Sequence, residues 1–102
     1  MHDENCIFCK IASGAFGTEF SYEDGNVVAF DDLNPQAPVH VLIVPKVHHA
    51  NIIDGVPSET LASMAAAVKA VAEQRGIAET GFRCIMNTGK DGGQAVMHLH
   101  MH

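Results

Sequence analysis

The feature that most constrains the fold of this chain is its last five residues, His98-Leu99-His100-Met101-His102. Histidines and apolar residues alternate there, and on a β-strand alternate side chains point to opposite faces. The segment therefore predicts a strand with three imidazoles on one face, because a helix would spread them around its axis. Two other interpretations stay open: a metal site using two neighbouring histidines, and a purification-tag remnant or solvated tail, although a tag would be an unbroken histidine run.

The composition is that of an ordinary globular protein. The sequence has 102 residues, 47% of them hydrophobic, and we expect a single domain over residues 1–102. No apolar run approaches the ~20 residues of a membrane span, and the polar, acidic start is unlike a signal peptide. Three cysteines without an export signal favour reduced thiols and a cytoplasmic location.

The net charge of −6 limits the partners that we expect. The basic residues are scattered and form no run or stripe: Lys10, Lys46, Lys69, Arg75, Arg83 and Lys90. We therefore expect neither polymeric nucleic acid nor an anionic membrane as a partner. A small anionic ligand needs only a local site and remains compatible with this charge.

The start of the chain predicts a short helix that carries a Cys-x-x-Cys pair. Ile7, Phe8 and Ile11 share one helical face. Cys6 and Cys9 have the spacing of zinc ligands, and the histidines elsewhere allow a site of two cysteines and two histidines. Two rival interpretations stay open at this point: a redox pair, which requires a thioredoxin-like βαβ context, and two inert, half-buried thiols.

The remaining chain predicts one long helix and a sheet. Strands are expected over residues 20–23, 27–31, 40–44, 82–87 and 98–102, with Asp24-Gly25 as a hairpin signal. Ser58 is expected to cap a helix that Gly76 ends. Its apolar stripe is Leu61, Met64, Ala65, Val68, Val71 and Ala72. The prediction is an α+β fold: a five-stranded, mostly antiparallel sheet, one long helix and a short N-terminal helix.

Two connecting segments hold candidate site residues. His48 and His49 follow the strand that Pro45 closes, and taken alone they fit a solvated turn. The glycine-rich segment 89–94 allows either a wide hairpin turn or a close approach of backbone N–H groups to an anion. It matches neither a P-loop nor a dinucleotide-binding fingerprint.

Several collinear segments together resemble the histidine triad (HIT) family. Residues 92–102 resemble its motif, in which histidines alternate with apolar residues and two further apolar residues follow. Matching segments lie upstream at 32–40, at 44–48, and at Asn87 with the glycine loop. The resemblance extends from about Cys6 to His102, where the chain stops inside the motif as an apparently truncated member. Relatives of this kind imply a homodimer.

The resemblance implies a nucleotide-binding hydrolase that acts at the α-phosphate of nucleoside monophosphate derivatives, with a purine nucleotide or nucleotide conjugate as its ligand. Within the family, the sequence is interpreted first as a member of the phosphoramidase-like branch. By match to the motif, His100 is the nucleophile and forms a nucleotidyl-histidine that water resolves. His102 assists the leaving group. The alternatives are a dinucleoside polyphosphate hydrolase and a non-catalytic nucleotide- or metal-binding module.

The same match implies a set of substrate-binding residues: Asp32, Leu33, His40, Asn87, Gly93, Gln94 and Ala95. Asp32 would bind the ribose hydroxyls, and Leu33 would face the base. Backbone donors near Gly93 and Gln94 would stabilise phosphoryl charge. Ala95 stands where phosphoramidase-type members often have serine, so a hydroxyl contact to the phosphate or leaving group is missing.

The resemblance also implies structural zinc. Family members with an N-terminal Cys-x-x-Cys bind zinc through that pair, a histidine after the Pro-Lys segment and the first triad histidine. In this sequence the implied ligands are Cys6, Cys9, His48 and His98, a closed set of four. His49 is the alternative to His48.

Overall fold

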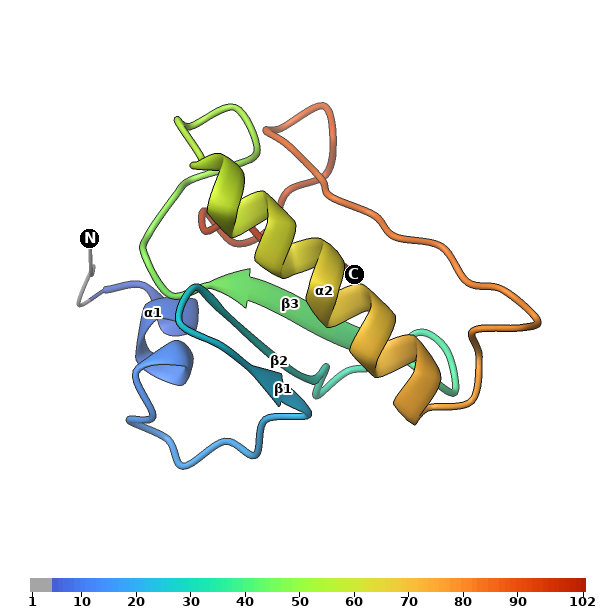
Figure 1. The fold of residues 1–102 in the computed structure, drawn as a ribbon. Helices are drawn as coiled ribbons and strands as arrows, with labels where there is room; N and C mark the ends of the chain where they lie inside the picture. The colour runs from blue at the N-terminus through green and yellow to red at the C-terminus, as the bar shows by residue number, and fades with distance from the viewer. Residues whose placement is uncertain (1–4) are drawn as a thin grey trace.

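A computed structural model describes residues 5–102 of the chain. The polar start, and with it the beginning of the expected 1–102 domain, lies outside this range. The described elements are α1 (Ile7–Ala12), β1 (Tyr22–Glu23), β2 (Val27–Asp31), β3 (Val41–Pro45) and α2 (Ser58–Gln74). Figure 1 shows α2 lying across one face of the sheet, with α1 beside the sheet near the start of the chain.

The sheet has the order β1-β2-β3, and both pairs of neighbours are antiparallel. The hairpin predicted from Asp24-Gly25 is confirmed, with β2 over the predicted residues. One carboxylate oxygen of Asp24 accepts hydrogen bonds from the backbone N–H groups of Asn26 (2.8 Å) and Val27 (2.9 Å). This turn therefore supplies its own hydrogen-bond acceptor, as Asp does in Asx turns.

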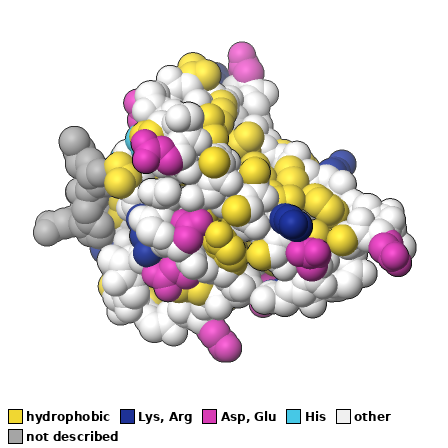
Figure 2. All heavy atoms as spheres, viewed as in Figure 1, with side chains coloured by type: hydrophobic (Ala, Val, Ile, Leu, Met, Phe, Trp, Pro, Cys, Tyr) yellow, Lys and Arg dark blue, Asp and Glu magenta, His cyan; other side chains and the backbone are white. Residues whose placement is uncertain are grey.

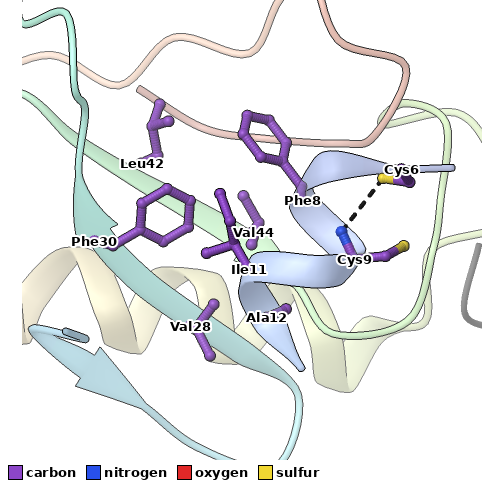
Figure 3. Close-up of a cluster of buried hydrophobic side chains, with 9 residues drawn as sticks. All are labelled: Cys6, Phe8, Cys9, Ile11, Ala12, Val28, Phe30, Leu42 and Val44. Carbon is purple, nitrogen blue, oxygen red and sulfur yellow. Dashed lines mark hydrogen bonds between the residues drawn. The ribbon is translucent and has the colours of Figure 1, made fainter. Parts of the chain in front are cut away.

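Both faces of the sheet are buried, each against a different helix. Alternate residues along β2 and β3 point to opposite faces, so the two strands contribute to two separate clusters. The cluster against α1 is shown in Figure 3 and consists of Cys6, Phe8, Cys9, Ile11, Ala12, Val28, Phe30, Leu42 and Val44. The cluster against α2 consists of Val27, Ala29, Val41, Ile43, Met64, Ala67, Val71 and Leu99.

Helix α2 lies where it was predicted, but its start and its buried face differ from the prediction. Pro57 occupies the N-cap position without a side-chain hydrogen bond, and Ser58 is the first helical residue. Leu61 is 40% exposed instead of buried. The buried residues are Thr60, Met64, Ala67, Val71 and Ala72. Because the helix is rich in alanine, it offers small apolar side chains on several faces, and packing against the sheet selects among them.

The predicted α+β class is confirmed, but the prediction of five strands is wrong, since the described residues form a sheet of three. Residues 98–102 and 82–87 contain no regular strand. Met101 forms one antiparallel bridge with Ile43, through N···O distances of 2.9 and 3.0 Å. His102 exchanges two hydrogen bonds with Ile85, of 2.7 and 2.9 Å. The two segments thus extend the sheet by isolated residue pairs.

Pro45 explains why the pairing with β3 stops so soon. In an antiparallel ladder, the next hydrogen-bonded pair after Ile43 and Met101 would be Pro45 with Leu99. Proline has no backbone N–H to donate to that ladder. The N–H of Leu99 instead donates to the carbonyl of His49 (2.6 Å). The chain therefore leaves the sheet at this point.

The prediction that the three histidines share one face is confirmed. Leu99 lies in the cluster against α2, and Met101 packs on it. The rings of His98 and His100 contact Phe8, which belongs to the opposite cluster. The ring of His102 lies beside that of His100, with centroids 5.0 Å apart.

The surface carries more acidic than basic side chains. On the face shown in Figure 2, Lys and Arg lie apart from one another among more numerous Asp and Glu. Two of the cations are paired, Lys46 with Glu23 and Arg75 with Asp31, each at 2.8 Å. Within residues 5–102, no helix combines the length and apolarity needed to cross a membrane.

One glycine of the 89–94 loop is required by close packing. A Cβ added at Gly92 would collide with the backbone of Thr88. We therefore predict that Gly92→Ala lowers the free energy of unfolding by about 1–3 kcal/mol, as overpacking does. Gly25→Ala is the matched control, because nothing lies within 4 Å of its added Cβ, and it should change stability by less than about 0.5 kcal/mol. Urea titration measures both, and equal effects would contradict the prediction.

Candidate active site and metal cluster

Four residues from three distant parts of the chain form a cluster of metal-ligand type. Cys6, Cys9, His48 and His98 each offer one ligand atom, and these atoms all lie within 4.8 Å of one another. The Sγ of Cys6 lies 3.1 Å from Nδ1 of His98. The Sγ of Cys9 lies 3.4 Å from Nδ1 of His98 and 3.4 Å from Nδ1 of His48. The cluster joins α1 to the histidine segment and to the chain after β3.

The hydrogen bond of the His98 ring leaves Nδ1, the nitrogen beside the two cysteines, available to bind a metal. Its Nε2–H donates to the carbonyl of Pro45 at 2.8 Å, so in the neutral ring the lone pair is on Nδ1, which faces the two thiols. A carbonyl behind the ring is the usual outer partner of a metal-binding histidine. The side chain is fully buried. Burial lowers the pKa of His98 to about 4, against the raising effect of the Pro45 hydrogen bond, so the ring is neutral at pH 7.

The structure separates the two adjacent histidines that the sequence left as alternatives. His48 lies in the cluster, with its ring edge-on to His98 at a centroid distance of 4.9 Å. His49 is turned away: its Nδ1 is 3.0 Å from the carbonyl of Asp54, and its own carbonyl accepts from Leu99.

The donor set fits zinc. Two thiolates and two neutral imidazoles are a common set for a closed, tetrahedral Zn²⁺ site. With typical zinc bonds of ~2.3 Å to sulfur and ~2.0 Å to nitrogen, neighbouring ligand atoms in a tetrahedron lie about 3.5 Å apart. The sulfur–nitrogen distances of 3.1 and 3.4 Å in the cluster are close to that value.

His100 is held so that one ring nitrogen is available for chemistry. Its Nδ1 lies 2.8 Å from the carbonyl of His98. A carbonyl only accepts, so Nδ1 carries the proton and Nε2 keeps its lone pair in the neutral ring. His100 is 6% exposed. A buried imidazole whose orientation is fixed by the backbone presents this lone pair in one direction, as a nucleophile requires.

A chain of hydrogen bonds fixes the tautomer of His102. The backbone N–H of Gln36 donates to Nδ1 of His40 (2.9 Å), so the proton of neutral His40 is on Nε2. That Nε2 lies 2.9 Å from Nδ1 of His102 and donates to it. The remaining proton of His102 is therefore on Nε2, where it can be donated to a ligand. Burial lowers the pKa of His102, and His100 and His40 lower it further, which favours the neutral ring.

Asp32 lies next to this hydrogen-bonded group, and its predicted contact with ribose hydroxyls stays a prediction. Its Oδ2 lies 3.4 Å from Nε2 of His40, and its Oδ1 accepts from the N–H of Asn34 (2.9 Å). Asp32, His40 and His102 also offer three potential metal-ligand atoms. A metal at Nε2 of His40 would require the ring proton on Nδ1, where the N–H of Gln36 already donates. The group therefore fits a hydrogen-bond chain better than a metal site.

A cavity of about 690 Å³ lies beside His40 and His102, between β3, α2 and the segment after α2. Asn87, His40 and His102 contribute to its lining, so three of the predicted site residues meet there. Most of the other lining residues are apolar. Leu33, in contrast, is 93% exposed, and its predicted contact with a base stays a prediction.

The predicted phosphate loop is held by its own hydrogen bonds. The N–H of Gly93 donates to Lys90 and that of Gln94 to Gly89, at 3.1 and 3.0 Å. The buried side chain of Gln94 donates to the carbonyl groups of Ala50 and Val96 and accepts from the N–H of Gly89. This amide therefore ties the loop to the chain after β3. Ligand contacts by Gly93, Gln94 and the exposed Ala95 stay predictions.

Two residues of the site were not found from the sequence. Gln36 sets the tautomer of His40 through its backbone N–H, and a backbone contact leaves no signal in the side-chain pattern. Phe8 packs against His98 and His100, with centroid distances of 5.9 and 5.0 Å. Its position inside the Cys-x-x-Cys pair was a usable signal, because a helix held by two cysteines of one cluster also fixes the residue between them.

The HIT domain family matches residues 16–102 of the chain. The chain belongs to the histidine triad family. The purine nucleoside phosphoramidase of Escherichia coli strain K12 is 43% identical over 101 residues, covering 97% of this chain and 85% of that protein. A 14 kDa zinc-binding protein of Zea mays is 39% identical over 108 residues, covering 100% of this chain and 82% of that protein.

A solved family structure has the same fold. A histidine triad protein of Clostridium difficile superposes with a TM-score of 0.91 at 46% identity, and the match covers 100% of this chain and 90% of that one. The family membership agrees with the alternating histidines of residues 98–102, which pair with β3 through Met101 and Ile43. It also agrees with the N-terminal cysteine pair meeting the first triad histidine.

Proposed function

We propose that this protein is a purine nucleoside phosphoramidase-like hydrolase. It cleaves the bond between the α-phosphate of a nucleoside monophosphate and its leaving group, through a nucleotidyl-histidine at His100. The observation that carries the proposal is the hydrogen bond from Nδ1–H of His100 to the carbonyl of His98 (2.8 Å). It directs the lone pair of Nε2 away from the backbone, and the 43% identity to the E. coli phosphoramidase supports this use of the site.

In the first step, Nε2 of His100 attacks phosphorus and a P–N bond to the ring forms. The bond from phosphorus to the leaving nitrogen or oxygen breaks, and the leaving atom keeps the electron pair. The ring becomes cationic, and the carbonyl of His98 stabilises this charge through Nδ1–H. In the second step, water attacks phosphorus and the P–N bond to His100 breaks. Overall, the leaving group receives a hydrogen and the phosphate a hydroxyl from water.

His102 is placed to assist the leaving group. Its ring lies 5.0 Å from that of His100, and its Nε2 carries the proton. A hydrogen bond from this Nε2–H to the leaving atom lowers the cost of negative charge developing there. One carboxylate oxygen of Asp32 accepts from the N–H of Asn34 and the other lies near Nε2 of His40. The carboxylate can also accept hydrogen bonds from ribose hydroxyls. Asn87, in the lining of the same cavity, is proposed to contact the phosphate.

We also propose that Cys6, Cys9, His48 and His98 hold a structural zinc ion. The sulfur–nitrogen distances, the outer hydrogen bond of His98 and the identity to the maize zinc-binding protein support this assignment. When bound, the ion would fix α1 and His98 relative to each other. Thiolate ligands of this kind fit a reducing compartment, which favours the cytoplasm.

A homodimer is the proposed assembly. Figure 2 shows apolar side chains gathered between α2 and the chain that follows it. Leu61, Phe82 and Met86 are 40%, 48% and 37% exposed. Burying such side chains against a second copy removes apolar surface from water. Light scattering should give about twice the monomer mass, and Phe82→Lys should shift the population toward the monomer. A wild-type monomer at high concentration would contradict the assembly.

His100→Ala should abolish turnover of adenosine 5′-phosphoramidate, with a loss of at least about 10³-fold, because no nucleophile remains. Nucleotide affinity should stay within a few-fold. His49→Asn is the matched control, since His49 lies outside both groups of site residues, and it should retain activity. Acid quench of wild-type protein should trap a nucleotidyl adduct that His100→Ala lacks.

The same assay separates the alternative functions. Phosphoramidates, dinucleoside polyphosphates and nucleotidyl sugars are compared at equal concentration. A preference for dinucleoside polyphosphates would transfer the assignment to that hydrolase class. Absence of turnover and of adduct with every substrate would leave a binding module.

Metal analysis tests the zinc assignment. Wild-type protein should contain about one zinc per chain, and Cys6→Ser or Cys9→Ser should reduce the content to near zero. Cys84→Ser is the matched control, because Cys84 is an exposed free thiol outside the cluster. His48→Gln should lose zinc and His49→Asn should retain it. Equal zinc content in all these variants would exclude this ligand set.

A further inference from the structure

Phe8 lies against the first two histidines of the triad, His98 and His100. Its ring is edge-on to His100 at a centroid distance of 5.0 Å and an angle of 67°, and to His98 at 5.9 Å and 85°. Its centroid also lies 6.1 Å from that of the Phe30 ring, at an interplanar angle of 63°. Figure 3 shows the Phe8 ring on the side of α1 away from Cys6, toward Phe30 and Leu42. An aromatic ring is thus packed edge-on against the ring of His100.

The hydrogen bond of His100 does not by itself fix the plane of the ring. The bond from Nδ1–H to the carbonyl of His98 holds one atom and leaves rotation about that contact open. Two rings restrict this rotation from different sides. The ring of Phe8 has its centroid 5.0 Å from that of His100, at an interplanar angle of 67°. The ring of His102 has its centroid 5.0 Å from that of His100, at an angle of 68°. The direction of the Nε2 lone pair therefore depends on both neighbours.

The position of Phe8 is set by the metal cluster. Phe8 lies between Cys6 and Cys9 in a helix of six residues, and Cys6 also caps that helix by accepting from the N–H of Cys9 (3.3 Å). Phe8 is 7% exposed, whereas its neighbour Ile7 is 50% exposed. Any rotation of α1 that withdrew Phe8 would also move the sulfur atoms away from His98. The ring and the two sulfur atoms therefore move as one unit.

We propose that Phe8 is a positioning residue for His100, and that it transmits the order of the cysteine–histidine cluster to the nucleophile. The proposal rests on the proposed function, in which His100 attacks phosphorus. Because an oriented lone pair is required in the transition state more than in substrate binding, loss of the ring lowers kcat and leaves KM nearly unchanged. A residue that only filled the core would change stability without this kinetic pattern.

The test compares Phe8→Leu with Phe16→Leu. Leucine keeps an apolar side chain but removes the aromatic edge, and Phe16 is a 58% exposed phenylalanine in the turn after α1. For each variant, zinc content, kcat and KM on adenosine 5′-phosphoramidate, and the NMR signals of the His100 ring are measured. Phe8→Leu should lower kcat about 10- to 100-fold, as small misplacements of reacting groups do, with KM within about twofold. Phe16→Leu should match wild type.

The NMR measurement tests the positioning role of Phe8 independently of the proposed function. Removal of the Phe8 ring should shift the ring-proton signals of His100 and broaden them, while zinc content stays near wild type. Unchanged His100 signals would overturn the positioning role even if wild-type protein has no phosphoramidase activity. A raised KM with unchanged kcat would assign Phe8 to nucleotide contact and also overturn it. If Phe8→Leu fails to fold, Phe8→Met, whose flexible side chain fills the gap, is read in the same way.

Discussion

The site depends on how residues 98–102 are attached to β3 and to the chain that follows it. Met101 bonds to Ile43 through both backbone groups, and His98 donates from its ring to the carbonyl of Pro45. Between them, Leu99 enters the cluster against α2. These contacts set the position of each histidine along β3 and the side of the segment on which its ring lies. The sheet therefore positions the histidine segment, although the segment joins β3 through one residue pair and is not a regular strand.

Burying imidazoles is costly unless their nitrogen atoms are paired, and this structure pairs them mostly with backbone. His98 and His100 each donate to a carbonyl, and His40 accepts from a backbone N–H. Among the described residues, no buried side-chain nitrogen or oxygen lacks a partner. Backbone carbonyls and amides cannot titrate or change rotamer. They therefore impose one tautomer on each ring, so that identical side chains present different nitrogen atoms, as the three proposed roles of nucleophile, donor and metal ligand require.

The sequence predicts the local elements and the shared face of the histidines because both follow from short-range periodicity. The ligand set of Cys6, Cys9, His48 and His98 follows only from family resemblance, since spacing alone left redox and inert thiols open. Long-range contacts account for what was missed. The buried face of α2 is chosen by the sheet, and the ladder stops because Pro45 happens to oppose Leu99. The amide of Gln94 is used to hold its own loop, which a motif match cannot reveal.

The brevity of α1 has a practical consequence for anyone who handles this protein. An isolated helix of six residues is far below the length that is stable in water, so its docking depends on its partners. Cys6 caps this helix and Cys9 lies within it, so their contacts with His98 and His48 are among those partners. Oxidation or alkylation of the two thiols would therefore weaken the attachment of α1 to the rest of the molecule as well as disrupt the cluster.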